Sequence, residues 1–180
     1  MAGGMKIRSR KILWGAILIA LFAGAAARLV SGALRPAAGQ SEATHSAAAA
    51  PSDPWTSAQT VQPADFSKEL ADAPPAAKPT IVCVGPRVLY RGGHIPGASY
   101  HGAASTPQGL DDLKKWADGI PRSANLVVYC GCCPLDRCPN LRPAFTALHD
   151  MGFTHLRALL LPTNFYTDWV KPGYPFEKSE

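Results

Sequence analysis

The sequence predicts an α/β domain with a largely parallel sheet. Three apolar runs, at 80–84, 126–129 and 156–161, are typical of buried strands, and the first two are rich in β-branched or aromatic residues. Apolar residues recur at helical spacing over 107–118 and again beyond residue 140. Strands that alternate with helices are joined by crossover connections, and these connections favour parallel pairing.

Residues 1–33 have the pattern of an export signal. The uncharged apolar run 12–27 follows a cluster of basic residues, namely Lys6, Arg8, Arg10 and Lys11. Small residues after the run permit cleavage, while the segment 12–30 is close to the roughly 20 residues of a membrane-spanning helix and could act as a tether. A cleaved signal peptide and a retained signal-anchor therefore both remain open. Either one predicts an exported protein, periplasmic or anchored to the membrane and facing the periplasm.

The rest of the chain divides into a linker and a nearly neutral domain. Residues 34–59 are rich in Ala, Pro, Ser and Gly and have no apolar period, which predicts a flexible linker before a domain over 60–180. From Asp65 onward there are 12 basic and 11 acidic residues, a net charge of +1. This balance gives no electrostatic reason to expect nucleic-acid binding.

Helical and extended segments alternate within the predicted domain. In chain order they are a helix over 63–71, a strand over 80–84, a turn or short helix over 87–91, an extended piece over 99–101, a helix over 107–118, a strand over 126–129, a helix beyond residue 140, a strand over 156–161 and a short helix over 165–170. Pro63 suits the first turn of a helix. Leu110, Leu113 and Trp116 share one face of the helix predicted over 107–118.

The stretch 125–142, NLVVYCGCCPLDRCPNLR, carries the residues with the strongest chemical character. Its strand leads directly into Cys130, and a loop containing Gly and Pro then holds three more cysteines. Asn140 is a candidate N-cap for the helix that follows. The order of elements predicts a thiol at the carboxyl end of a strand, facing the positive end of a helix. Such a thiol should have a depressed pKa and be nucleophilic near neutral pH.

Three motifs resemble those of the rhodanese-domain family. Tyr90 precedes GHIPGA at 93–98, VVYC at 127–130 opens a loop, and 164–176 contains a Trp followed by GYP. The resemblance covers about residues 60–180. It implies a rhodanese-like α/β fold, with a sheet of about five largely parallel strands and helices on both faces. It also implies a sulfurtransferase that moves sulfane sulfur through a cysteine persulfide, from a small donor to a thiol or other nucleophile, with no cofactor.

Carried over by position, the resemblance makes Cys130 the catalytic nucleophile. Backbone N–H groups of Gly131, Cys132 and Cys133 are expected to meet an anionic donor and the persulfide. Arg137 is expected to bind an anionic donor such as thiosulfate. The loop is longer than is usual in the family, and Cys132 with Arg137 forms C-x4-R, so Cys132 is the rival nucleophile. Two further residues, His94 and Cys83, are expected to be structural, the first holding a turn and the second buried in a strand.

The additional cysteines leave other chemistry open. Cys132, Cys133 or Cys138 could form a loop disulfide in an oxidising compartment, or resolve a persulfide or an oxidised sulfur on Cys130. No metal site is predicted, because the spacing is not the C-x2-C of common zinc sites and no nearby His completes a ligand set. The alternatives to sulfur transfer are a periplasmic thiol–disulfide or redox protein and a non-catalytic metal or sulfur carrier.

Overall fold

Parallel strands form the centre of the fold, and the computed structural model describes residues 52–179 of the chain. The strands are β1 Thr60–Val61, β2 Thr80–Cys83, β3 Ala98–Tyr100, β4 Asn125–Tyr129 and β5 His155–Leu159. They form one five-stranded sheet in the order β1-β5-β4-β2-β3, and every pair is parallel. The predicted sheet of about five largely parallel strands is confirmed, with β4 in its middle.

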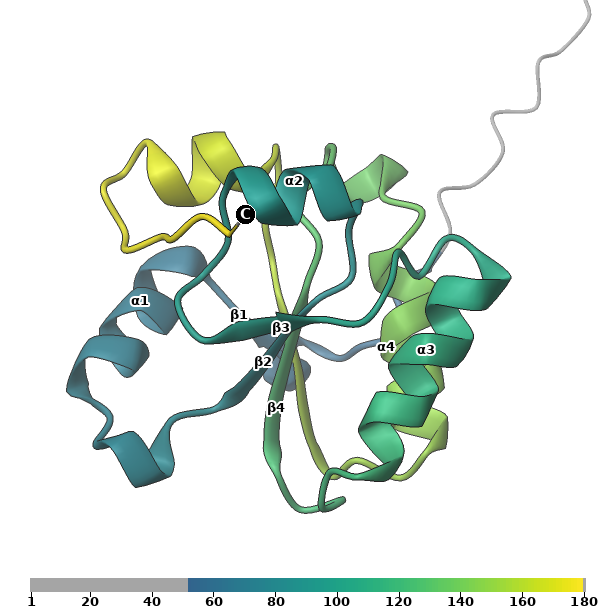
Figure 1. Cartoon of the computed structure of the whole chain (residues 1–180). Coiled ribbons are helices and arrows are strands. Elements are labelled where there is room, and N and C mark those ends of the chain that lie inside the picture. The colour runs from purple at the N-terminus through teal and green to yellow at the C-terminus, as the bar shows by residue number, and fades with distance from the viewer. Residues whose placement is uncertain (1–51, 180) are drawn as a thin grey trace, which may run out of the picture. The chain divides into compact units, whose positions relative to one another are not determined.

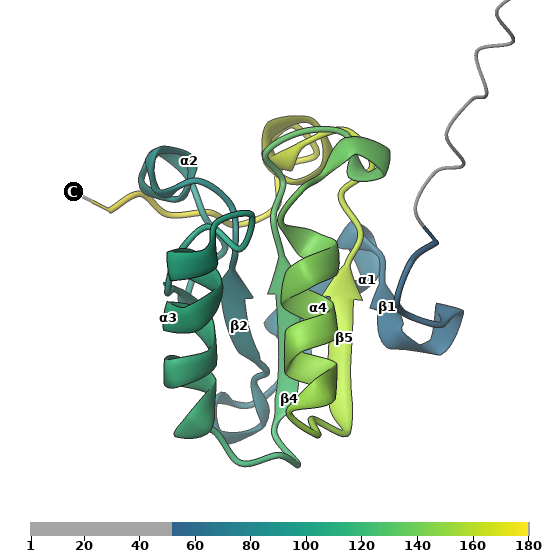
Figure 2. The ribbon, with the colours of Figure 1, turned by 90° about the vertical axis from the view of Figure 1, so that its right-hand side faces the viewer.

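Helices cover both faces of the sheet, as predicted (Figures 1 and 2). They are α1 Pro63–Asp72, α2 Arg87–Gly92, α3 Pro107–Asp118 and α4 Leu141–Asp150, with 3₁₀ turns at Ser57–Gln59, Pro75–Ala77 and Leu135–Arg137 and a π-helical turn at Tyr166–Val170. One face carries α1, and the other carries α3 and α4 side by side. The short helix α2 lies beyond the carboxyl ends of the strands, beside the C-terminal segment drawn in yellow.

Successive side chains of each strand point to opposite faces of the sheet and so divide the core into two layers. In β2, Val82 packs in the layer with α3 and α4, whereas Ile81 packs in the layer with α1. Val128 and Val127 of β4 divide in the same way. Successive side chains of a strand point to opposite faces, so a strand covered on both faces must be apolar at every position. This requirement explains the continuous apolar runs in the sequence.

Packing against the domain begins before the predicted start at residue 60. The Trp55 ring packs edge-on against the Phe145 ring of α4, with 5.3 Å between the ring centroids. Asp53 forms an ion pair with Arg142 of the same helix at 2.7 Å. The last residues of the predicted linker 34–59 therefore lie against α4. Strand β1 was not predicted, because two residues are too few for a pattern.

The predictions for the N-terminal segment fall outside the described residues. They concern the export signal over 1–33 and the linker as far as residue 51. Between residues 52 and 179, no helix combines the length and the apolar character needed to cross a membrane.

Candidate functional site

The candidate site lies at the carboxyl end of β4. The chain passes from β2 outward to β3 and then returns to β4 on the opposite side of β2, so its winding reverses between β2 and β4. In a parallel sheet, the crevice at such a reversal is the usual place for a ligand. Cys130 is the first residue after β4 and is only 5% exposed. Its position at this crevice follows from the topology of the sheet.

Gly131 turns the chain sharply after Cys130. Its φ of +70° lies in the left-handed region, which favours glycine. A Cβ at this position would lie 2.8 Å from the Cβ of Phe165. The Gly131 carbonyl oxygen accepts a hydrogen bond from the backbone N–H of Phe165 at 3.0 Å. The turn thus needs glycine both for its conformation and for space, and it brings the next cysteines back toward Cys130.

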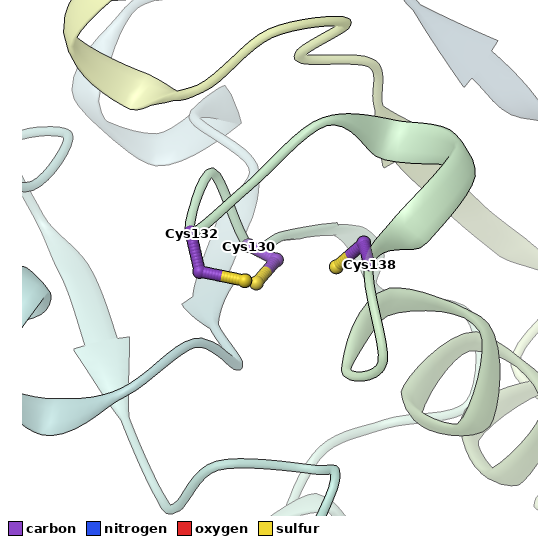
Figure 3. Close-up of side chains that lie close together, drawn as sticks. All are labelled: Cys130, Cys132 and Cys138. Atoms are coloured by element: carbon purple, nitrogen blue, oxygen red, sulfur yellow. The ribbon is translucent and has the colours of Figure 1, made fainter.

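Three side chains form what we call the thiol cluster: Cys130, Cys132 and Cys138. Their Sγ atoms all lie within 4.8 Å of one another. Figure 3 shows the side chains of Cys132 and Cys138 directed toward Cys130. Cys133 lies beside the cluster, with its Sγ 3.0 Å from the Sγ of Cys132. One loop therefore gathers four thiols, and the three in the cluster are the described residues best placed to bind a metal ion.

Hydrogen bonds within the cluster separate the acidities of its thiols. Donation from the Cys130 thiol, then from Cys133 and Asn140, lowers the pKa of Cys132 to about 5. Donation to Cys132 and Cys138, together with burial, raises the pKa of Cys130. Burial and donation to Cys132 raise the pKa of Cys133 to about 12. The directions of these pKa shifts favour the anionic form on Cys132 over Cys130, which is opposite to the expectation that Cys130 would be the most ionised thiol.

The amino terminus of α4 acts on Cys138. A hydrogen bond from Cys130, followed by the backbone N–H groups of Asn140 and Leu141, lowers the pKa of Cys138 to about 7 in spite of burial. The sequence predicted this helix-terminus effect, but for Cys130. Cys138 lies three residues before the first residue of α4, and its thiol is next to the free N–H groups at the start of this helix.

The side chain of Asn140 does not cap α4, contrary to the prediction. It makes no capping hydrogen bond, although the residue is at the N-cap position. Its Oδ1 instead accepts from the backbone N–H of Ser105 at 2.9 Å, and its Nδ2 donates to the Sγ of Cys132 at 3.6 Å. Asn140 is 2% exposed. This buried amide therefore ties the thiol loop to the segment that precedes α3 and directs a donor at the Cys132 thiolate.

A cavity of about 520 Å³ opens beside the thiol cluster. Cys130, Gly131 and Cys132 line it from the loop, and Cys83 lines it from the end of β2. Among the residues that the structure describes, the exposed large apolar side chains are Val88, Leu89, Tyr166 and Phe176, and all four line this cavity. Lys178 is the single charged residue in the described lining. The cavity thus has a thiol-bearing wall and an apolar mouth.

The structure brings together most of the predicted site residues but not Arg137. Its side chain is 83% exposed, its Nε lies 3.9 Å from Oδ2 of Asp136, and it does not line the cavity. The residue ends the exposed 3₁₀ turn of the loop, where a guanidinium keeps its hydration. Arg142 is also directed elsewhere, toward Asp53 and the carbonyl oxygen of Leu135. The anion-binding role of Arg137 stays a prediction.

The structural role predicted for His94 is confirmed. Its Nδ1 lies 2.8 Å from the carbonyl oxygen of Tyr90, its ring stacks on the Tyr90 ring at 3.9 Å between centroids, and its Nε2 lies 3.3 Å from Glu177. The residue does not line the cavity. Cys83 is buried at the end of β2, also as predicted.

The residues at the apolar mouth of the cavity were not predicted from the sequence. Val88 and Leu89 come from α2, whereas Tyr166 and Phe176 come from the last segment of the chain. A sequence signal did exist, since Val88 and Leu89 are adjacent apolar residues in a short predicted helix with no assigned core face. Their convergence with the C-terminal segment depends on tertiary structure and could not be predicted.

Comparisons with solved structures confirm the rhodanese-like fold. The Rhodanese-like domain of the Alr3790 protein from Anabaena sp. is 22% identical, with a TM-score of 0.50 and coverage of 67% of this chain and 80% of that one. A crystal structure of the Alr3790 protein is also 22% identical, with a TM-score of 0.51 and coverage of 66% and 91%. The BH2092 protein from Bacillus halodurans is 17% identical, with a TM-score of 0.50 and coverage of 67% and 77%. No family model and no curated protein matches the sequence.

Proposed function

We propose that this protein is a sulfurtransferase in which Cys130 carries sulfane sulfur as a persulfide. The observation that carries the proposal is the position of Cys130, which lies directly after the middle strand, lines the cavity and has its Sγ within 4.8 Å of the Cys132 Sγ. The rhodanese-like fold supports the proposal at the level of fold. The substrates are a small sulfane-sulfur donor and a thiol acceptor.

The first half-reaction loads sulfur onto Cys130. Its Sγ proton passes to the Cys132 thiolate as the Cys130 sulfur attacks the sulfane sulfur of the donor. A new S–S bond forms, the bond between that sulfur and the rest of the donor breaks, and the donor leaves with the electron pair. Cys132 is placed to take this proton because its Sγ belongs to the cluster in which all three Sγ atoms lie within 4.8 Å of one another.

The second half-reaction passes the sulfur to the acceptor. An acceptor thiolate attacks the outer sulfur of the persulfide, the bond between that sulfur and Cys130 breaks, and Cys130 leaves as a thiolate. The proton held by Cys132 returns to Cys130, and the acceptor becomes a persulfide. An acceptor with an apolar body suits the mouth formed by Val88, Leu89 and Phe176. The cycle consumes no external oxidant or reductant.

Thiol–disulfide exchange is the second candidate function. It is favoured by the contact of 3.0 Å between the Sγ atoms of Cys132 and Cys133. In this reaction two thiols of the loop lose two protons and two electrons to a partner disulfide, which is reduced to two thiols. Equilibration of the loop with glutathione, in the absence of any sulfur transfer, would favour this function.

We propose, in addition, that the protein is exported and works in the periplasm, free or tethered through residues 12–30. The basic cluster and the apolar run 12–27 support this location. A reporter that works only outside the cytoplasm should be active when it is fused after Glu180. Equal activity of a fused reporter that works only inside the cytoplasm would contradict export.

Turnover measurements test the sulfurtransferase proposal. The reduced protein is supplied with thiosulfate or inorganic polysulfide and with an acceptor thiol, and the acceptor persulfide is measured over time. Cys130→Ser should lower kcat by roughly 10³-fold or more, since a hydroxyl cannot carry sulfane sulfur. Cys83→Ser is the matched control, because it removes another buried thiol from the same cavity. No turnover with either donor, or full turnover by Cys130→Ser, would contradict the proposal.

A further inference from the structure

We propose that the thiol cluster of Cys130, Cys132 and Cys138 is a binding site for a soft monovalent cation, Cu(I). This site goes beyond sulfur transfer and does not depend on it. It uses the same loop, but it needs three thiols at once instead of one carrier and one base.

The spacing of the sulfur atoms fits one bound ion. Three sulfurs in trigonal coordination, with metal–sulfur bonds of about 2.3 Å, lie about 4.0 Å apart. The three Sγ atoms already lie within 4.8 Å of one another. No pair of sulfurs therefore has to approach by more than about 0.8 Å for the cluster to close around an ion. Rotation of the partly exposed Cys132 side chain can provide part of this adjustment.

The donor set selects a soft ion with a low coordination number. Thiolates favour Cu(I) and zinc over harder ions such as Mg²⁺ or Ca²⁺. Structural zinc sites almost always have four ligands. Cys133 is excluded from the mutually close set, and His149 is an exposed residue of α4 whose Nδ1 lies 3.6 Å from Asp150. Three mutually close sulfur ligands fit Cu(I), which accepts trigonal coordination.

The surroundings of the cluster suit an ion that must be kept from water. Cys130 and Cys138 are buried in the core layer that contains Leu141 and Phe145. A hydrophobic shell around a metal site controls the access of solvent. Asn140 donates to the Sγ of Cys132 and so fixes the direction of one ligand, as outer-shell partners of metal sites do. The cluster therefore has a dry side formed by the core and an open side at the cavity.

Binding of the ion is a ligand exchange without electron transfer. Thiol ligands must be deprotonated, so Cu(I) enters as protons leave, and the metal keeps its oxidation state. An ion held by Cys130 prevents that sulfur from attacking a donor. Metal binding and sulfur loading should consequently exclude each other at this site.

A competition titration tests the proposal on the reduced protein under anaerobic conditions. Cu(I) is presented as its complex with a chromophoric chelator such as bicinchoninate, and its transfer is followed by the loss of the chelator's absorbance. The expected result is one Cu(I) withdrawn per chain. X-ray absorption of the loaded wild-type protein should show a first shell of three sulfurs with no nitrogen or oxygen. A two-sulfur shell, or no withdrawal of copper, would overturn the proposal.

Substitutions separate the three ligands from the other thiols. Cys138→Ser should weaken Cu(I) binding by more than the roughly 10–100-fold typical of losing an outer-shell partner. Cys133→Ser is the matched control from the same loop, and Cys83→Ser is the control from β2. Neither should change the affinity appreciably. An equal loss in Cys133→Ser and Cys138→Ser, or Zn²⁺ binding as tight as that of Cu(I), would overturn the three-thiol assignment. The chelator titration and the X-ray absorption measurement do not depend on sulfur transfer. A failure of the Cu(I) proposal can therefore be distinguished from a failure of the sulfurtransferase proposal.

Discussion

The carboxyl ends of β2 and β4 present two thiols in similar positions and different chemical settings. Cys83 is the last residue of β2, and Cys130 directly follows β4, the neighbouring strand. Both are buried, and both line the same cavity. The segments that follow differ, since Gly85-Pro86 leads from β2 into α2, whereas Gly131 turns the chain after β4 so that other cysteines approach Cys130.

The two strand ends give their thiols different neighbours. Burial raises the pKa of Cys83 to about 11, and its neighbours offer little to offset that effect. Cys130 is also buried, but the thiols of Cys132 and Cys138 lie beside it in the thiol cluster. The pKa of partly exposed Cys132 is lowered to about 5 there, whereas the pKa of Cys130 is raised. Chemical function in this molecule thus depends on the loop after the strand.

Alkylation at different pH values should reveal the largest difference between the thiols at the carboxyl ends of β2 and β4. Cys132, with a pKa of about 5, is ionised at pH 7, whereas Cys83, with a pKa of about 11, is not. The thiolate fractions at pH 7 differ by about 10⁴-fold. Iodoacetamide labelling with peptide mapping should show Cys132 reacting faster as pH rises through about 5 and levelling off above it. A Cys132 rate that still rises steeply between pH 8 and pH 9 would contradict the described hydrogen bonding.

Alanine at Gly131 and at Gly85 should lower the free energy of unfolding by different amounts. Gly131→Ala places a Cβ 2.8 Å from Phe165 at a φ of +70° and should destabilise the domain by about 1–3 kcal/mol. Gly85→Ala places a Cβ 3.2 Å from the Sγ of Cys130, at a φ that other residues adopt, and should cost less. Denaturant unfolding of both variants measures the difference. An equal or larger loss in Gly85→Ala would mean that the turn after β4 is not the strained element.

Removal of the Asn140 amide should give the smallest effect. Asn140→Ala loses the hydrogen bonds to Ser105 and Cys132 and should cost about 1 kcal/mol, because the exposed backbone N–H of Ser105 can bond to water instead. The pKa of Cys132 should rise, since a donor to its thiolate is lost. Asn140→Asp keeps an acceptor for Ser105 without the donor to Cys132, so it should raise that pKa with a smaller loss of stability. An unchanged labelling profile in both variants would contradict this role.

The sequence predicted the elements that depend on local pattern. Continuous apolar runs defined β2, β4 and β5, and the spacing of Leu110, Leu113 and Trp116 defined α3. The position of Cys130 after β4 was predicted for the same reason, because a strand and its next residue are adjacent in the chain. The structural role of His94 was also predictable, since its turn is local and its contact with Tyr90 spans four residues.

The sequence could not predict how side chains far apart in the chain combine. Asn140 was expected to cap its own helix, yet a backbone N–H from Ser105 attracts its side chain. The order of acidity in the loop depends on which thiol donates to which, and this follows from the turn at Gly131. The apolar mouth combines α2 with the C-terminal segment. Each of these features arises from tertiary contacts, for which composition and spacing give no signal.

Mapping of the loaded sulfur tests the central claim most directly. The wild-type protein is reduced, loaded from thiosulfate or polysulfide, alkylated and digested, and fragment masses then locate the added sulfur within residues 123–137. We expect one additional sulfur atom on Cys130, none on Cys132 or Cys83, and no loading of Cys130→Ser. Sulfur on Cys132 in the wild-type protein, retained in Cys130→Ser and lost in Cys132→Ser, would instead make Cys132 the carrier.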